Sequence, residues 1–222
     1  MSPIRLIDVV FLIVFVLIGI RLVPGALRLL RIYLTIGSRR LEDATALAPA
    51  EPAEVSELTS RLLELGFRRI GVRSAVLPGE GRRFEWNLVD EPTTTYISLV
   101  PVAGKHRLIT ACYSAFADGA FLETVYPSGA TVRRPDLDAR AAGQTPEESI
   151  SFHHQRLAAF AVDHGPPLTN ATMADLLARD DAYRRRHGGA TIRRGVYSLV
   201  ALAAFVIATI AFLLARIVFF DT

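Results

Sequence analysis

Residues 9–20 read Val-Val-Phe-Leu-Ile-Val-Phe-Val-Leu-Ile-Gly-Ile, an uninterrupted apolar run within a longer apolar segment over residues 4–23. A second apolar segment covers residues 196–214 of the 222-residue chain. A helix rises about 1.5 Å per residue, so about 20 apolar residues cross the roughly 30 Å hydrocarbon core of a bilayer. The two segments therefore predict transmembrane helices within residues 1–24 and 191–222, with a domain over residues 51–190 between them.

The first segment has a rival interpretation as a cleaved signal peptide, because Arg5 precedes a short apolar run. Against this, no small-residue cleavage site follows closely, and residues 21–31 remain apolar and basic. We therefore favour an anchor. Residues 25–50 are expected to form an amphipathic juxtamembrane segment and a linker, in which residues 25–36 either continue the first span as a helix or lie in the membrane interface.

Arginines flank both apolar segments on the side of the central domain. They are Arg21, Arg28, Arg31, Arg39 and Arg40 after the first segment, and Arg193 and Arg194 before the second. Basic residues favour the cytoplasmic side of a membrane. Lys105 is the only lysine among 25 basic residues, and this bias, together with abundant alanine, is typical of a high-GC bacterial genome. We expect a bacterial cell-membrane protein with a cytoplasmic central domain and both termini outside.

The net charge of +3 belongs to the membrane-flanking segments and not to the domain. Residues 41–190 hold 16 basic and 20 acidic residues, a net charge of −4, while the remaining residues carry a net charge of +7. Nucleic-acid binding needs clustered positive charge on the domain itself, so no nucleic-acid partner is expected. The lipid bilayer is the partner that this charge distribution predicts.

The second apolar segment carries alanines at steps of three and four, which places them on one helix face: Ala201, Ala204, Ala208, Ala211 and Ala215. Small residues let helices approach closely in lipid. The pattern predicts a packing seam against the first span, a second copy of the chain or another membrane-protein subunit. The alternative is that the stripe only reflects the high alanine content of the chain.

The central residues alternate between helical and strand-like patterns, which predicts an α+β fold. A helix is expected over residues 51–65, followed by strands over residues 70–77, 84–88, 94–102, 107–116 and from residue 121. Short connections between them predict a five-stranded antiparallel meander. Residues 127–144 contain prolines and glycines and are expected to form a surface loop. Two further helices, from Thr145 to His164 and over residues 170–186, are expected to pack with the first on one face of the sheet.

Few residues point to chemistry. His153 shares a helical stripe with Ile150 and Leu157, so it should face the sheet, where Thr110 and Tyr113 are candidates to join it in a ligand site. No metal-binding spacing and no nucleophile motif occurs, and Cys112 is the single cysteine. The sequence therefore predicts no catalytic residue, no metal and no cofactor.

Two functions remain open. The first is a non-enzymatic interaction or regulatory domain that belongs to a membrane assembly. The second is a membrane-bound enzyme or a small-ligand sensor, with a pocket between the sheet and the helix that carries His153. The absence of a catalytic motif and the alanine stripe favour the first.

Overall fold

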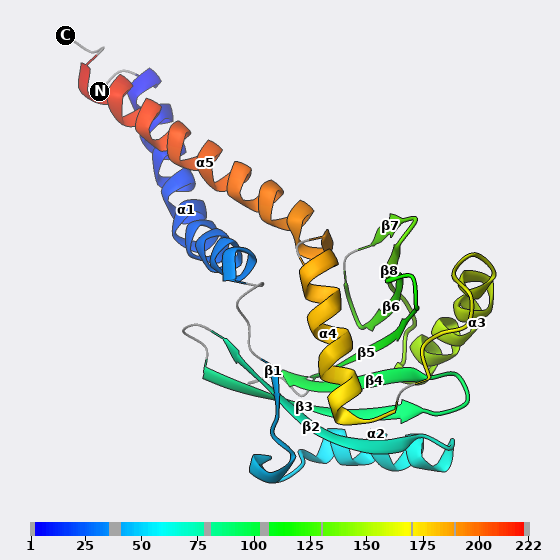
Figure 1. Ribbon diagram of the computed structural model, residues 1–222. Helices are drawn as coiled ribbons and strands as arrows, with labels where there is room; N and C mark the ends of the chain where they lie inside the picture. The colour runs from blue at the N-terminus through cyan, green and yellow to red at the C-terminus, as the bar shows by residue number, and fades with distance from the viewer. Residues whose placement is uncertain are drawn as a thin grey trace. The chain divides into compact units, whose positions relative to one another are not determined.

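The computed structural model describes residues 3–35, 41–77, 81–102, 107–129, 131–169, 171–188 and 190–219 (Figure 1). The chain divides into two compact units. One consists of Met1–Ile36 with Ile192–Thr222, and the other of Gly37–Thr191. The first unit is helical, and the second is an α+β domain built around a single mixed sheet.

The helical unit contains α1 (Pro3–Thr35) and α5 (Ala190–Phe219). Within them, Leu6–Arg31 and Gly195–Val218 are apolar and long enough to cross a membrane. The helix α1 passes through Pro24 and continues to Thr35. Of the two conformations expected for residues 25–36, the described residues adopt the one that continues the first helix.

The positions of α1 and α5 that are buried or half-buried recur at alternating steps of three and four residues. On α1 they include Asp8, Leu12, Phe15, Gly19, Leu22, Ala26, Leu29 and Tyr33, and on α5 Val196, Leu199, Ala203, Val206, Ile210, Leu213 and Ile217. A Cβ atom on Gly19 would lie 3.5 Å from both Val206 and Ile210. This heptad spacing is typical of paired helices, and 3.5 Å is an ordinary van der Waals distance, so α5 packs against α1 at Gly19.

The domain sheet has eight strands in the order β1-β2-β3-β4-β5-β6-β8-β7. Adjacent strands are antiparallel except β6 and β8, which run parallel. The strands are β1 (Leu41–Asp43), β2 (Arg68–Leu77), β3 (Gly81–Asp90), β4 (Thr95–Val102), β5 (Arg107–Ala115), β6 (Phe121–Tyr126), β7 (Val132–Arg134) and β8 (Leu137–Ala141).

The prediction of a five-stranded antiparallel meander is therefore wrong in extent and in type. The strands β2 to β6 do follow one another as a meander, but the sheet is mixed and continues at both edges. Residues 127–144 hold β7 and β8 instead of only a loop, and Leu137 and Ala139 of β8 are buried. At the other edge, β1 lies in the range assigned to a linker and pairs with β2.

Three helices cover both faces of this sheet, which corrects the expectation of one covered face. On one face lie α2 (Ala53–Glu64) and α3 (Pro146–His164), whose Leu58 and Ile150 pack in one cluster with Trp86 and Cys112. On the other lies α4 (Met173–His187), whose Leu176 packs with residues of β3, β4 and β5. A short 3₁₀ helix, η2 (Thr45–Leu47), precedes α2.

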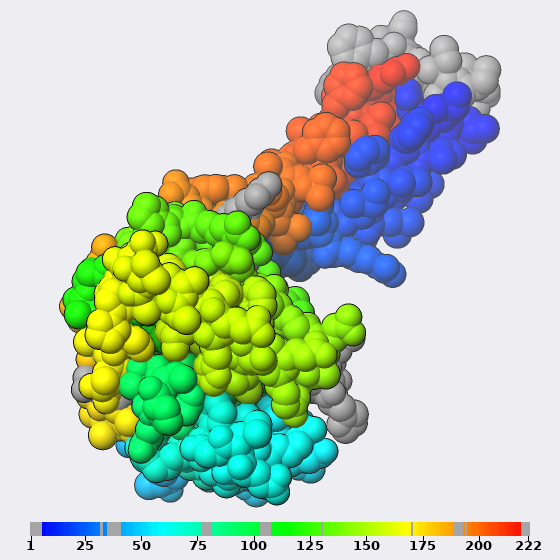
Figure 2. Space-filling view, turned by 90° about the vertical axis from the view of Figure 1, so that its right-hand side faces the viewer, coloured from blue at the N-terminus to red at the C-terminus, as the bar shows by residue number. Residues whose placement is uncertain are grey.

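Local sequence signals explain where the helices begin. At α3, the Thr145 hydroxyl accepts a hydrogen bond from the backbone N–H of Glu148, and Pro146 occupies the first turn. At α4, Thr172 and Asp175 form a reciprocal capping box. Figure 2 shows α2 and α3 together on one side of the domain. Most of the hydrophobic core lies between these two helices and the sheet.

Candidate functional site

His153 lies in the middle of α3, and its imidazole is completely buried against the sheet. Its Nε2 atom is 3.2 Å from Ser114 Oγ on β5, and its Nδ1 atom is 3.0 Å from Thr124 Oγ1 on β6. Burial lowers the pKa of His153 well below its usual value, and His154 and Arg156 lower it further. The imidazole is thus held neutral with a hydroxyl partner at each nitrogen, as expected for a histidine that stabilises the fold.

Polar side chains extend this contact in both directions between α3 and the sheet. On one side, Arg156 donates to Thr124 Oγ1 at 3.0 Å and pairs with Asp138 at 2.8 Å. On the other side, Ser114 Oγ lies 3.3 Å from Thr95 Oγ1. The side chains fill the helix–sheet interface around His153 and bind one another, although the buried Nε–H of Arg156 has no partner among the described residues.

The other two residues predicted with His153 lie apart from it. Thr110 is buried on the same face of β5 as Ser114, and its hydroxyl has no hydrogen-bond partner among the described residues. Tyr113 lies on the opposite face, where its hydroxyl is 3.4 Å from Arg73. The structure therefore does not bring the three side chains together, and their role in binding a ligand stays a prediction.

A second polar cluster lies on the face of the sheet that α4 covers. Arg73 on β2 donates to Glu85 on β3 at 2.7 Å and to Asp180 on α4, and only 10% of its side chain is exposed. Burial alone would lower the pKa of Arg73, but the two carboxylates outweigh it and raise that pKa. Burial also raises the pKa of Asp180, against the effect of Arg73. These three residues, the Arg73 cluster, join α4 to two strands.

Two further polar contacts hold α4 on the same face. The Tyr183 hydroxyl donates to Glu123 on β6 at 2.9 Å, and burial raises the pKa of that carboxyl. Near the end of the helix, Arg186 pairs with Asp136 at 3.1 Å. The attachment of α4 to the sheet therefore combines the apolar contacts of Met173 and Leu176 with these polar ones.

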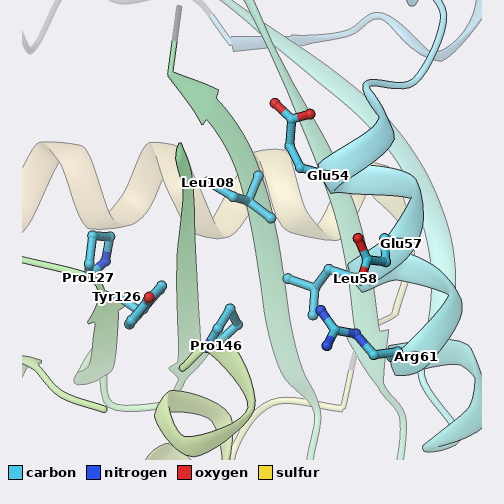
Figure 3. Close-up of a pocket in the computed structure, with 8 residues that line it drawn as sticks. All are labelled: Glu54, Glu57, Leu58, Arg61, Leu108, Tyr126, Pro127 and Pro146. Atoms are coloured by element: carbon cyan, nitrogen blue, oxygen red, sulfur yellow. The ribbon is translucent and has the colours of Figure 1, made fainter. Parts of the chain in front are cut away.

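An open groove of about 440 Å³ lies between α2 and the ends of β5 and β6 (Figure 3). One wall comes from α2 and carries Glu54, Glu57 and Arg61, and the facing wall carries Leu108 and Tyr126. Pro127 and Pro146 complete the facing side, and Leu58 of α2 also lines the groove. Charged groups on one wall and apolar groups on the other suit a surface contact better than catalysis.

A second hollow, of about 350 Å³, lies where η2 and α2 meet a β-bulge in β2. We call it the bulge pocket. The register of β2 against β3 shifts between Arg69 and Gly71, and Gly71 has a φ of 131°, which a side chain would strain. The remaining lining residues are Thr45, Glu51, Thr59, Ile70, Val72, Trp86, Asn87 and Leu88.

The described residues form neither a metal-binding cluster nor a site with a reactive thiol. No group of three or more histidine, cysteine, aspartate or glutamate side chains is placed there to hold a metal ion. Cys112 is fully buried in the core, and burial raises the pKa of its thiol to about 12. Since the thiolate is the reactive form, Cys112 is nearly inert at neutral pH.

The alanine stripe of α5 lies away from the contact with α1. Ala201, Ala204, Ala208 and Ala211 are exposed, and Ala215 is half-buried. The helix α1 instead meets α5 at the heptad positions around Gly19. The predicted seam is therefore not the one that joins the two helices of a single chain.

The membrane-flanking arginines are found on both helices of the first unit. Arg21, Arg28 and Arg31 are exposed on α1, and Arg193 is exposed on α5 with its guanidinium 5.4 Å from the ring centre of Tyr197. Arg194 also lies in α5, whereas Arg39 and Arg40 lie outside the described residues.

An ion pair links the two helices. Asp8 on α1 lies 3.1 Å from Arg216 on α5, and only 11% of the Asp8 side chain is exposed. A charge within an apolar helix is costly unless it is paired, so this contact accounts for an aspartate in an otherwise apolar segment.

Together these features define a small α+β domain that is attached in sequence to a pair of long apolar helices. The chain matches no protein-family model, no curated protein and no solved structure.

Proposed function

We propose that this chain is a two-span protein of a bacterial cell membrane, whose domain acts as a non-catalytic interaction or regulatory module within a membrane assembly. In this proposal the domain is cytoplasmic and both termini are outside. Two helices of sufficient length and apolarity support the spans. The arginines on the domain side of both spans support the orientation. The buried polar groups around His153 and Arg73 bind one another instead of facing a cavity, which supports a structural role for the domain.

The exposed alanine face of α5 is the observation that carries the assembly role. Since α1 contacts α5 elsewhere, Ala201, Ala204, Ala208 and Ala211 face outward from the helix pair. In lipid, small residues allow two helices to approach closely enough for extensive van der Waals contact. The occupant that we assign is the same face of a second copy of the chain, which would make a symmetric dimer.

Cysteine cross-linking in membranes tests this dimer. Ala208→Cys should form a disulfide-linked dimer on mild oxidation, because the two copies of the alanine face meet. Ile207→Cys is the matched control. Ile207 is also exposed and is one residue away, but it points about 100° around the helix and should form little dimer. The native Cys112 need not be removed, because its buried thiol does not react. Equal cross-linking at both positions, or none at either, would contradict the symmetric alanine contact.

The orientation is tested by labelling with a membrane-impermeant maleimide. Leu65 is 65% exposed on the domain, so Leu65→Cys should react in inverted membrane vesicles but not in intact cells. A cysteine added after Thr222 should show the reverse pattern, which provides the internal control. Labelling of Leu65→Cys in intact cells would place the domain outside and overturn the proposed topology.

The second function suggested by the sequence was an enzyme or sensor with a pocket beside His153. The hydrogen bonds of both ring nitrogens of His153 give that location no support. A different hollow, the bulge pocket, has features that favour ligand binding.

A further inference from the structure

The bulge pocket has the size of a small-molecule site. Its volume of about 350 Å³ falls at the lower end of the range of roughly 300–1,000 Å³ that is typical of ligand pockets. The β-bulge at Gly71 forms part of its wall, together with Glu51 and Thr59. β-Bulges recur next to functional sites because they locally redirect side chains.

Two side chains of opposite charge line the pocket, and neither uses all of its hydrogen-bonding positions. Glu51 accepts a hydrogen bond from Thr59 at 3.1 Å and pairs with Arg69 at 2.9 Å. A carboxylate offers about four acceptor positions, so acceptor capacity remains on Glu51. Arg69 donates through Nη1 alone, and its other N–H groups have no partner among the described residues. Its side chain is 47% exposed, so these donors are accessible.

The wall next to these charges is apolar, with one unused donor. Trp86 is 7% exposed and packs in the main core cluster together with Val72 and Leu88. Its indole N–H has no hydrogen-bond partner among the described residues and is not one of the fully buried unpaired atoms, so this donor remains accessible to solvent or to a ligand.

We propose that the bulge pocket binds a free amino acid with an apolar side chain. Its ammonium group would bind Glu51, its carboxylate would bind the free N–H groups of Arg69, and its side chain would lie against Trp86 and Leu88. The adjacent negative and positive groups of the pocket match the adjacent charges of a zwitterion, and arginine binds carboxylates with two parallel hydrogen bonds. The inference goes beyond the proposed membrane assembly, and the two are tested by separate measurements.

The full-length protein in detergent micelles provides a direct readout, because Trp86 is the only tryptophan of the chain. Titration with L-leucine should change the indole emission in a saturable manner. Two analogues separate the charges. Isopentylamine lacks the carboxylate and 4-methylpentanoate lacks the ammonium group. Each analogue loses one charged hydrogen-bonding group, so each should bind at least about tenfold more weakly. Calorimetric titration with the same compounds checks the fluorescence result.

Matched variants locate the binding. Glu51→Gln and Arg69→Gln should each weaken L-leucine binding at least about tenfold, because each removes one of the two charges. Glu57→Gln and Arg61→Gln, in the neighbouring open groove, should leave it unchanged. The unfolding midpoint of each variant shows that it is folded. The proposal is overturned if L-leucine causes no saturable change by either method, if an analogue binds as tightly as L-leucine, or if Glu51→Gln and Arg69→Gln bind normally.

Discussion

Replacement of Arg73 by methionine is expected to lower the free energy of unfolding of the domain by about 3–5 kcal/mol, because it leaves buried carboxylates without their cation. Arg73 contacts both Glu85 and Asp180, and all three side chains are at least 85% buried. Burial already raises the pKa of Asp180, so loss of the guanidinium would favour its protonated form still more. The measurement is denaturant unfolding of the full-length protein, followed by the emission of Trp86.

Two control variants separate the effect of leaving buried charges unpaired from the effect of losing an ion pair at the surface. Arg82 pairs with Glu42 at the surface, where both side chains are 40% or more exposed, and Arg82→Met should cost less than about 1 kcal/mol. The triple variant Arg73→Met, Glu85→Gln and Asp180→Leu removes the orphaned charges and should recover much of the stability. Equal losses for Arg73→Met and Arg82→Met would show that the Arg73 cluster does not hold α4 on the sheet.

The parts of the fold that were predicted correctly depend on local signals. The proline and threonine at the start of α3 and the alternation of Phe84, Trp86 and Leu88 act through neighbouring residues, and the structure places a helix and a strand there. The sequence gives no local signal for β8, because its five residues follow Pro135 and its parallel pairing with β6 depends on contacts distant in sequence. The face that α4 covers is hidden from the sequence for a related reason. Its contacts through Asp180 and Tyr183 join residues that are distant in the chain.

The candidate sites show the same contrast between local signals and contacts that are distant in sequence. The helical stripe of α3 correctly indicated that His153 faces the sheet, but Tyr113 was grouped with it although odd and even residues of β5 face opposite sides. The sequence does not single out Arg73, because an arginine in an alternating strand is usually exposed to solvent. The bulge pocket had one readable signal, since an isolated glycine inside a strand indicates a bulge, and Gly71 is such a residue. Its partner Glu51 comes from a different element, which only the folded chain brings close.

Acid is expected to destabilise the domain through His153. In the unfolded chain this imidazole binds a proton with a pKa near 6.5, whereas in the fold burial holds its pKa well below that value. The unfolded state therefore binds more protons, and the stability present above pH 6.5 is lost as the pH falls. The free energy of unfolding should decrease by about 1.4 kcal/mol for each pH unit below about 6.5, until the folded pKa is reached.

His153→Gln separates this contribution from those of the other histidines. Glutamine cannot titrate and satisfies only part of the hydrogen bonding of the imidazole, so the variant should be less stable at pH 8 by about 1–3 kcal/mol. Below pH 6.5 the difference from the native protein should shrink by about 1.4 kcal/mol per pH unit, because only the native protein loses stability through this residue. Thr124→Val removes one partner of His153 but keeps the imidazole buried, so it should lose stability without losing the pH dependence. A difference between His153→Gln and the native protein that stays constant from pH 8 to pH 5 would mean that His153 accepts a proton within the fold, and that the network between α3 and the sheet opens to water.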